Sequence, residues 1–311
     1  MKPLPVQIEP NQPEIRSPRW WLDPFLWGFV VIFGAAFTVL PNISTDWLST
    51  ILIPVGTILA IAVVVFFSRK QSPAALKITH PAMEWWLAVG WYVVFMVLSI
   101  ITKGGGILAN DLAKWLWFVI IPLGILWFAR GRSSNMTSFL RSVGLHRQGL
   151  WKGLLLGLSA FIILLPFVLI SMPSAQLTKI LDIFRQPLQA VIIIPVSFLL
   201  LLFTAGFTEE MFFRGILQSR LAKVMKSEMR SCLIIALLFG LYHLPYAYFS
   251  ADWAPHGHLV WAIASVMTEQ TIAGLVLGVL WMRTRNLGSS ILLHVLIDLL
   301  PAMTMLHFTI R

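Results

Sequence analysis

The chain has 311 residues, of which 58% are hydrophobic and 12% are charged, and its mean hydropathy is +0.82. Soluble domains carry about 25% charged residues, so this composition excludes a soluble protein of this length and predicts that lipid surrounds most of the chain. The net charge of +10 does not indicate binding to nucleic acid, because the basic residues lie in short clusters between apolar runs. The one cysteine, Cys232, excludes an internal disulfide and a four-cysteine metal cluster.

Residues 1–23 are rich in proline with scattered charge, which predicts a disordered cytoplasmic tail. Apolar runs follow, most of them close to the ~20 residues that cross ~30 Å of hydrocarbon as a helix. We therefore predict an all-α, polytopic transmembrane helical bundle of about nine spans, with eight possible because the first run is short. The runs are 24–40, 48–67, 84–101, 112–129, 152–172, 188–213, 231–249, 259–282 and 289–306.

Lysine and arginine predict the orientation of these spans, since cytoplasmic loops carry an excess of both. Nine spans with the N-terminus in the cytoplasm leave only five of the 23 basic residues on the other side, whereas eight spans would spoil this asymmetry. We therefore expect a multi-pass protein of the cell membrane. The five residues on the far side are Lys103, Lys114, Lys179, Arg185 and Arg311.

Ionisable residues at membrane depth divide the chain into two regions. Residues 24–140 carry almost none and no assignable motif, so they are predicted to be N-terminal spans of unknown role. Residues 141–311 carry a set of them in the last four runs, where such groups are costly and usually functional. This set is Glu209, Glu210, Arg214, His243, Glu269, His294 and Asp298.

Three of these residues are expected at a similar depth. Counted along a helix from the nearest basic residue, Glu209, His243 and His294 lie ~16, ~20 and ~13 Å from the predicted cytoplasmic face. Taken alone, His243 is as well explained by helix packing as by chemistry. The three together favour a shared site.

Residues four apart share one face of a helix, and this spacing predicts the local pairs. Glu210 and Arg214 are expected to form a structural ion pair, which leaves Glu209 to face elsewhere. His294 and Asp298 have the same spacing, so the carboxylate can hold the imidazole in one tautomer.

Three further features have structural explanations. Phe239, one turn before His243, is expected to form an aromatic wall beside it. Glu269 with Gln270 is better explained by an interhelical hydrogen bond than by catalysis. The basic segment 214–230 is expected to be an amphipathic segment on anionic lipid.

Three strings of residues resemble the motifs of one known family. Glu209-Glu210-Met-Phe-Phe-Arg214 is similar to the EExxxR motif of the CAAX protease and bacteriocin-processing (CPBP, or Abi) family, which includes the type II CAAX prenyl endopeptidase. Phe239-Gly-Leu-Tyr-His243 resembles its FxxxH motif, and His294-Val-Leu-Ile-Asp298 its HxxxN/D motif. Each motif is weak alone, but all three occur in order. The resemblance covers about residues 140–306.

This resemblance implies an intramembrane endopeptidase whose site opens to the cytoplasm. By the family's pattern, Glu209 would activate a water molecule, and His243 would share the proton transfer. His294 and residue 298 would stabilise the oxyanion, with Glu210, Arg214 and Phe239 in support.

One departure from the pattern matters, because residue 298 is aspartate where the prenyl-protein proteases carry asparagine. An ionised aspartate would repel an oxyanion, so Asp298 must be protonated, orient His294 or bind a metal. Glu209, His243 and His294 would also form a plausible zinc site of two histidines and one carboxylate. The sequence thus leaves two alternatives for the cofactor, namely none or zinc.

The sequence leaves three functions open. The first is cleavage of a membrane-associated protein or peptide. The second is a non-catalytic membrane scaffold or regulator with the same fold, and the third is a proton-coupled transporter. The intact motifs favour the enzyme, and the partners expected are the lipid bilayer and the substrate, not nucleic acid.

Overall fold

The computed structural model describes residues 22–40, 47–104, 111–130 and 135–304, and all regular structure within these ranges is helical. The predicted all-α class is confirmed for these residues. The predicted tail lies outside them except for residues 22 and 23. The elements are α1 (Pro24–Val39), α2 (Trp47–Ser68), α3 (Pro81–Ile101), α4 (Asp111–Trp115), η3 (Leu116–Ile120), α5 (Ile121–Ala129), α6 (Met136–Ser142), α7 (Leu150–Ser171), α8 (Ser174–Arg185), α9 (Pro187–Leu201), η4 (Leu202–Gly206), α10 (Phe207–Glu210), η5 (Met211–Gln218), α11 (Ser219–Met225), α12 (Glu228–Tyr242), α13 (Leu244–Phe249), α14 (Leu259–Thr268), α15 (Gln270–Thr284) and α16 (Leu287–Met303).

Within the described chain, seven helical segments are long and apolar enough to cross a membrane. They correspond to the second to eighth of the nine predicted runs. The first and last runs form shorter apolar helices, α1 with 16 residues and α16 with 17, and the last two residues of the ninth run lie outside the description. The chain is therefore a membrane protein of many helices, whereas its span number and orientation stay predictions.

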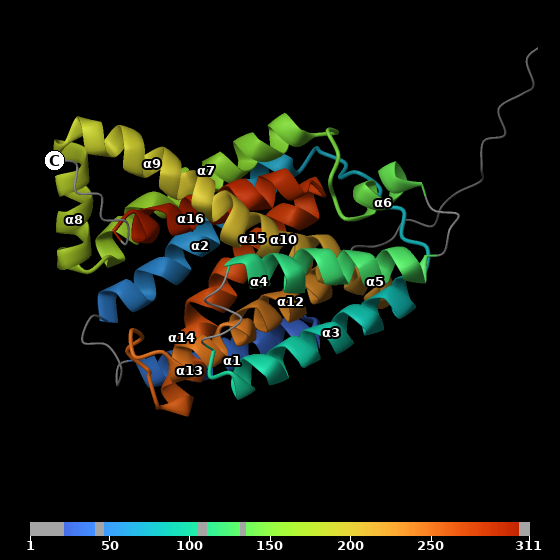
Figure 1. Ribbon diagram of the computed structural model, residues 1–311, viewed down its shortest axis with the longest axis horizontal. Coiled ribbons are helices and arrows are strands. Elements are labelled where there is room, and N and C mark those ends of the chain that lie inside the picture. Colours follow the sequence, from blue (N-terminus) through green and yellow to red (C-terminus); the bar gives the residue numbers. More distant parts are fainter. Residues whose placement is uncertain (1–21, 41–46, 105–110, 131–134, 305–311) are drawn as a thin grey trace, which may run out of the picture.

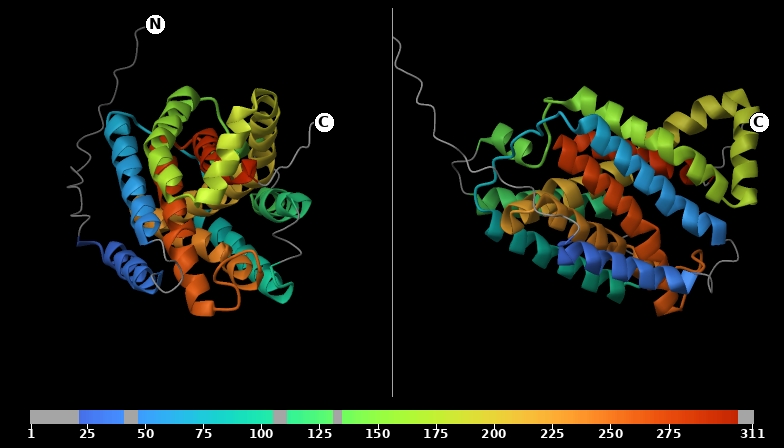
Figure 2. Two further views of the ribbon diagram at one scale, coloured as in Figure 1. Left: turned by 90° about the vertical axis from the view of Figure 1, so that its left-hand side faces the viewer. Right: turned by 180° about the vertical axis from the view of Figure 1, so that it is seen from behind.

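Most helices run roughly along the long axis of the molecule, and α8 lies across one end of the bundle (Figure 1). Seen from behind, α1 and α2 lie on either side of the α14–α15 pair (Figure 2). A close approach holds α2 against α7, since a Cβ atom on Gly56 would lie 2.6 Å from the ring of Phe167. Because α2 also contacts α15, the N-terminal spans are packed directly on the C-terminal region.

The sixth predicted run is longer than expected. It was predicted to end near residue 213, but the helical segment continues from Pro187 to Met225, over 39 residues. The expectation that residues 214–230 lie on lipid as an amphipathic segment is wrong for its first part, because Arg214 and Arg220 are fully buried. Carboxylates of the protein, rather than lipid headgroups, neutralise these two charges.

Arg220 belongs to a buried cluster that joins three helices. The carboxylate of Glu84 on α3 accepts hydrogen bonds from Arg220 on α11, at 3.0 Å, and from Arg130 after α5, at 3.0 Å for each oxygen. Arg220 also donates to the carbonyl oxygen of Ser142, at 3.1 Å. The first five runs thus contain a buried carboxylate that the sequence did not single out, and it connects them to the C-terminal region.

The largest apolar core lies between α3, η3, η5 and α12. Aromatic rings dominate it, and Phe118 is central, with ring centroids 5.1 Å from Phe212 and 5.3 Å from Tyr242. Phe213 contacts Phe239 at 5.1 Å in an edge-to-face arrangement. Aromatic pairs of this kind favour fixed ring orientations. This core is therefore expected to hold the adjoining polar residues of the candidate site in fixed positions.

Candidate active site

The segment that carries Glu209 and Glu210 is irregular. These residues lie on the short helix α10, between the π-helical segments η4 and η5. Such π-helical insertions within α-helices often occur at functional sites. Gly206, just before α10, permits a close approach to α16, because a Cβ atom there would lie 2.6 Å from Cγ2 of Val295. The approach brings both glutamates within reach of His294.

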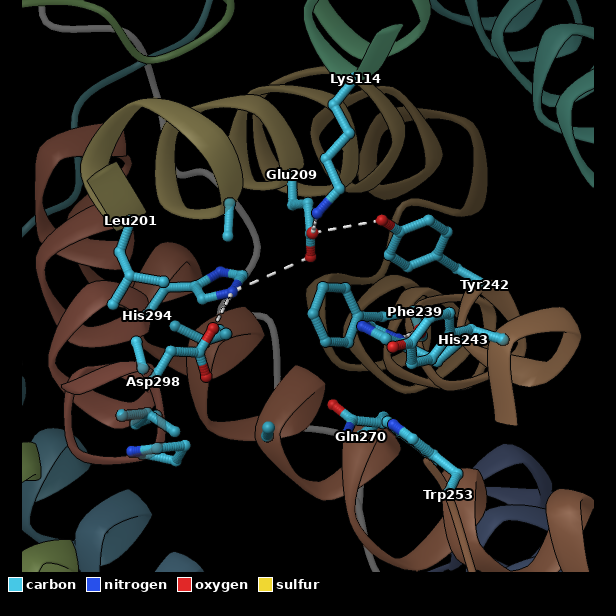
Figure 3. Close-up of a pocket in the computed structure, with 17 residues that line it drawn as sticks. Lys114, Leu201, Glu209, Phe239, Tyr242, His243, Trp253, Gln270, His294 and Asp298 are labelled. Atoms are coloured by element: carbon cyan, nitrogen blue, oxygen red, sulfur yellow. Dashed lines mark hydrogen bonds and ion pairs between the residues drawn. The ribbon is translucent and has the colours of Figure 1, made fainter. Parts of the chain in front are cut away.

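Glu209 lies at the centre of the site (Figure 3). Its Oε1 atom is 3.1 Å from the ammonium nitrogen of Lys114 and accepts a hydrogen bond of 3.2 Å from the hydroxyl of Tyr242. Its Oε2 atom is 3.9 Å from Nε2 of His294. One carboxylate oxygen is thus held by two donors, while the other has only this long contact.

Lys114 reaches Glu209 because α4 is anchored beside α10. The indole nitrogen of Trp115 donates a hydrogen bond of 2.8 Å to the carbonyl oxygen of Phe203, and its ring stacks on Phe207 at 5.1 Å. These contacts direct the neighbouring lysine into the bundle. The carboxylate at the centre of the site therefore takes its counter-charge from the N-terminal region.

His294 lies among three carboxylates. Its Nδ1 atom is hydrogen-bonded to Oε1 of Glu210 at 2.9 Å, and its Nε2 atom is 3.3 Å from Oδ2 of Asp298. Carboxylates only accept hydrogen bonds, so an N–H on each ring nitrogen satisfies both contacts, and this is the imidazolium form. The predicted pairing of His294 with Asp298 is confirmed, whereas the contact with Glu210 was not expected.

Glu210 and Arg214 support His294 from behind. Oε2 of Glu210 is 3.3 Å from Nε of Arg214, so the predicted ion pair is confirmed. The guanidinium also lies over the ring of Phe239, 4.7 Å from its centroid, and donates a 3.3 Å hydrogen bond to the carbonyl oxygen of Gly274. With an imidazolium at His294, three cations balance the three carboxylates of the site, which limits the cost of burying them.

His243 enters the site with a defined tautomer. Its Nδ1 atom is 2.9 Å from the carbonyl oxygen of Phe239, which can only accept a hydrogen bond. The hydrogen therefore sits on Nδ1, and Nε2 of the neutral ring is left as an acceptor. Phe239 packs edge-on against His243 at 5.1 Å and against His294 at 5.9 Å, as the predicted aromatic wall requires.

These side chains surround a cavity of about 580 Å³. Glu209, His243, His294 and Asp298, predicted from three separate helices, all line it. Glu210 and Arg214 do not line it and lie behind His294. The structure thus brings together the four residues predicted as catalytic and puts the two charged supporting residues outside the cavity.

The cavity reaches an unexpected end of the bundle. Its walls include Trp253, in the loop between α13 and α14, and Ala302, near the end of α16. Under the predicted orientation both lie on the side away from the cytoplasm. A cavity that opens at this end would conflict with the expectation that both the N-terminus and the mouth of the site face the cytoplasm. The depth estimates measured the distance from the basic end of each helix and carried no information on which end the cavity reaches.

Residues 191–300 match the family model described as type II CAAX prenyl endopeptidase Rce1-like. This segment is an Rce1-like domain. It contains all seven residues of the three motifs, and the predicted resemblance to the CPBP family is confirmed. The chain has no match among curated proteins or among solved structures. The predicted domain limits, 141 and 311, lie beyond the matched segment and stay a prediction.

The zinc alternative does not fit the geometry of the Rce1-like domain. Among the described residues, no group of three His, Cys, Asp or Glu side chains is spaced to hold a metal ion. Glu209 is instead paired with an ammonium group, and both ring nitrogens of His294 face carboxylates. Two of the three expected ligands are thus engaged with other groups.

Two residues of the site were missed by sequence reasoning. Lys114 lies outside the Rce1-like domain and was interpreted as a charge flanking a span, although it is the single cation of its apolar run. Tyr242 stood inside the quoted FxxxH string without an assigned role. A lysine one turn into an apolar run was the only signal for the first, and nothing in the sequence marked the second.

Proposed function

We propose that this chain is an intramembrane endopeptidase that hydrolyses a peptide bond of a membrane-associated protein or peptide. The observation that carries this proposal is that Oε2 of Glu209 has no close hydrogen-bond donor among the described residues, in a cavity within a helical bundle. His243 lines the same cavity, and its Nε2 atom is a second hydrogen-bond acceptor. The Rce1-like domain supports a protease, since the matched family is one of prenyl endopeptidases.

In this mechanism Glu209 and His243 prepare the nucleophile. A water molecule in the cavity donates its hydrogen atoms toward these two acceptors, and its oxygen attacks the carbonyl carbon of the substrate. The proton taken from water is passed to the amide nitrogen as the C–N bond breaks, so an acid and an amine are released. General acid–base catalysis of this kind contributes about 10²–10⁴-fold to a rate.

His294 is suited to stabilise the oxyanion. Held as an imidazolium, it places a positive charge beside the cavity and needs no rearrangement as negative charge develops. The contact of Asp298 with Nε2 supports one of the three roles left open for this residue, namely orientation of His294. The carboxylate charge of Asp298 is then compensated by the ring and need not repel the oxyanion.

The proposal is tested with purified protein reconstituted in liposomes and offered a peptide library in ¹⁸O-labelled water. We expect wild type to generate new C-termini that contain ¹⁸O, and Glu209→Gln to generate none while remaining folded and inserted in the membrane. Asp182→Asn is the matched control, because this exposed residue pairs only with Arg185 on the surface.

Two results would contradict the proposal. Folded wild-type protein that cleaves no peptide would favour the scaffold or regulator. Proton movement into liposomes without cleavage would favour the transporter.

A further inference from the structure

A second chamber of about 570 Å³ adjoins the active-site cavity. The two share part of their walls, including Gln270, Ile297 and Asp298. Asp298 also contacts His294, so the second chamber begins about one side chain from the proposed reaction centre. A peptide bound at Glu209 therefore has direct access to it.

The chamber contains two acidic residues, Glu269 and Asp298, and none of the described residues that line it is a lysine, arginine or histidine. The charge of Asp298 is compensated by His294, so Glu269 is the acidic side chain left without a described cation. Glu269 forms no ion pair with a described cation. It is an exposed residue, and it lines the chamber. Its side chain is hydrogen-bonded to Ser265 in the same span, and the expected interhelical hydrogen bond is not among its contacts in the described chain. An acidic side chain inside a membrane span that has no cationic partner among the described residues indicates a ligand or substrate contact.

The backbone explains how Glu269 is presented to the chamber. The 26-residue apolar span Leu259–Thr284 is interrupted at this residue, since α14 ends at Thr268 and α15 begins at Gln270. Glu269 has φ −98° and ψ −65°, and its side chain caps neither helix. Irregular backbone at membrane depth is tolerated where it lines a cavity.

The remaining walls suit a long cationic side chain. Ile53 and Pro54 of α2 and Leu164 and Val168 of α7 form an apolar surface opposite α14 and α15. Lysine and arginine lay their aliphatic stems along apolar surface while the charged group finds a polar partner. We propose that the second chamber is a subsite for a lysine or arginine side chain close to the scissile bond, with Glu269 as its counter-charge. This inference rests on the proposed function.

The proposed subsite implies that α2 takes part in recognition of the substrate. This helix lies outside the Rce1-like domain, yet with α7 it closes the chamber on the side away from Glu269. Selectivity for a basic residue therefore depends on Ile53, Pro54 and Thr57 as well as on the motifs.

The test uses peptides that differ at one position, in the pairs lysine and norleucine, and arginine and citrulline. Citrulline keeps the length of arginine, norleucine lacks only the terminal ammonium group of lysine, and both replacements remove the charge. We expect wild type to prefer the charged member by about tenfold in kcat/KM, a ratio typical of a charge-assisted hydrogen bond. Glu269→Gln is expected to lose the preference, Glu269→Lys to favour glutamate at the same position, and Asp182→Asn to keep the wild-type pattern.

A binding measurement separates this inference from the proposed function. The same peptides are titrated against Glu209→Gln protein, with and without Glu269→Gln. A preference for lysine that depends on Glu269, with no cleavage by wild type, would support the subsite and contradict the protease. Equal binding of lysine and norleucine to this protein, or a preference that survives Glu269→Gln, would overturn the subsite.

A second variant covers the case in which Glu269→Gln does not fold. Gln176 lines the chamber from α8, so Gln176→Lys supplies a resident cation and is expected to abolish the preference. Retained preference in this folded variant would also overturn the proposal.

Discussion

The ammonium group of Lys114 lies 3.1 Å from Oε1 of Glu209, although 95 positions separate the two residues in the sequence. This contact joins the N-terminal spans to the proposed catalytic carboxylate. We expect Lys114→Met to lower kcat by about 10²-fold or more with a smaller change in KM, because one buried charge loses its partner. Steady-state kinetics in liposomes provide the measurement.

Lys114→Arg is the matched control for this prediction, since it keeps the charge and is expected to restore much of kcat. A rise in KM alone for Lys114→Met would instead assign the lysine to substrate binding.

Asp298→Asn tests the role of the residue that departs from the family's pattern. The amide oxygen can still accept a hydrogen bond from Nε2 of His294, so we expect activity to be kept or increased. Cleavage by wild type and variant is measured across pH, each with and without a chelator. If Asp298 supports a metal, activity should fall about 10–100-fold and partly return with zinc.

Arg214→Ala should lower both stability and activity. Glu210 would remain buried without its ion-pair partner, which costs about 3–5 kcal/mol for a truly buried pair, and Glu210 holds the ring of His294. Thermal unfolding and cleavage are measured on the same preparations. Arg185→Ala breaks an exposed pair and is expected to change stability by at most about 1 kcal/mol. An inactive Arg214→Ala protein of wild-type stability would indicate contact with substrate.

Asp23 provides a pH-dependent contact between α1 and α12. The hydrogen bond from Arg230 lowers the pKa of Asp23 below its ordinary value of 3.8. Because the folded-state pKa is depressed, the stabilisation is present above pH 3.8 and is lost as the pH falls through the lower folded value. The melting temperatures of wild type and Asp23→Asn should differ near pH 7 and converge as the pH falls below 3.8 and through the folded-state pKa. A constant difference over this range would show that the ion pair contributes nothing.

The side of the membrane that the cavity faces can be tested with introduced cysteines. The native Cys232 is buried, so wild type provides a low background. By the distribution of lysine and arginine, an impermeant maleimide added to intact cells should label His256→Cys and not Lys226→Cys. The reverse pattern would put the cavity mouth in the cytoplasm and would make the predicted orientation wrong.

The sequence predicted those contacts of the site that join residues of one helix. Glu210 with Arg214, and His294 with Asp298, are pairs four residues apart on one helix, and both pairs are present. The contact between Glu210 and His294 joins two helices, and no pattern within either helix specifies which helices touch. The same applies to Lys114, whose position depends on the contacts of Trp115 with Phe203.

The fold was predictable for a related reason. Nine apolar runs are a property of composition along the chain, and each of them became a helix. The irregular stretches were not predictable, because neither η4, η5 nor the break at Glu269 is marked by proline. The cluster of Glu84 with Arg130 and Arg220 was missed because its members lie far apart in the sequence, and no local pattern links them.

The proposed active site draws one or more side chains from each of α4, α10, α12 and α16, and α16 is the last helix described. A chain synthesised only as far as α15 therefore has the carboxylate of Glu209 but neither the imidazole of His294 nor its partner Asp298. Under the proposed function, hydrolytic activity would then arise in a single late step of biogenesis, after the preceding helices have entered the bilayer. Unfinished chains would be harmless to neighbouring membrane proteins without any inhibitory segment.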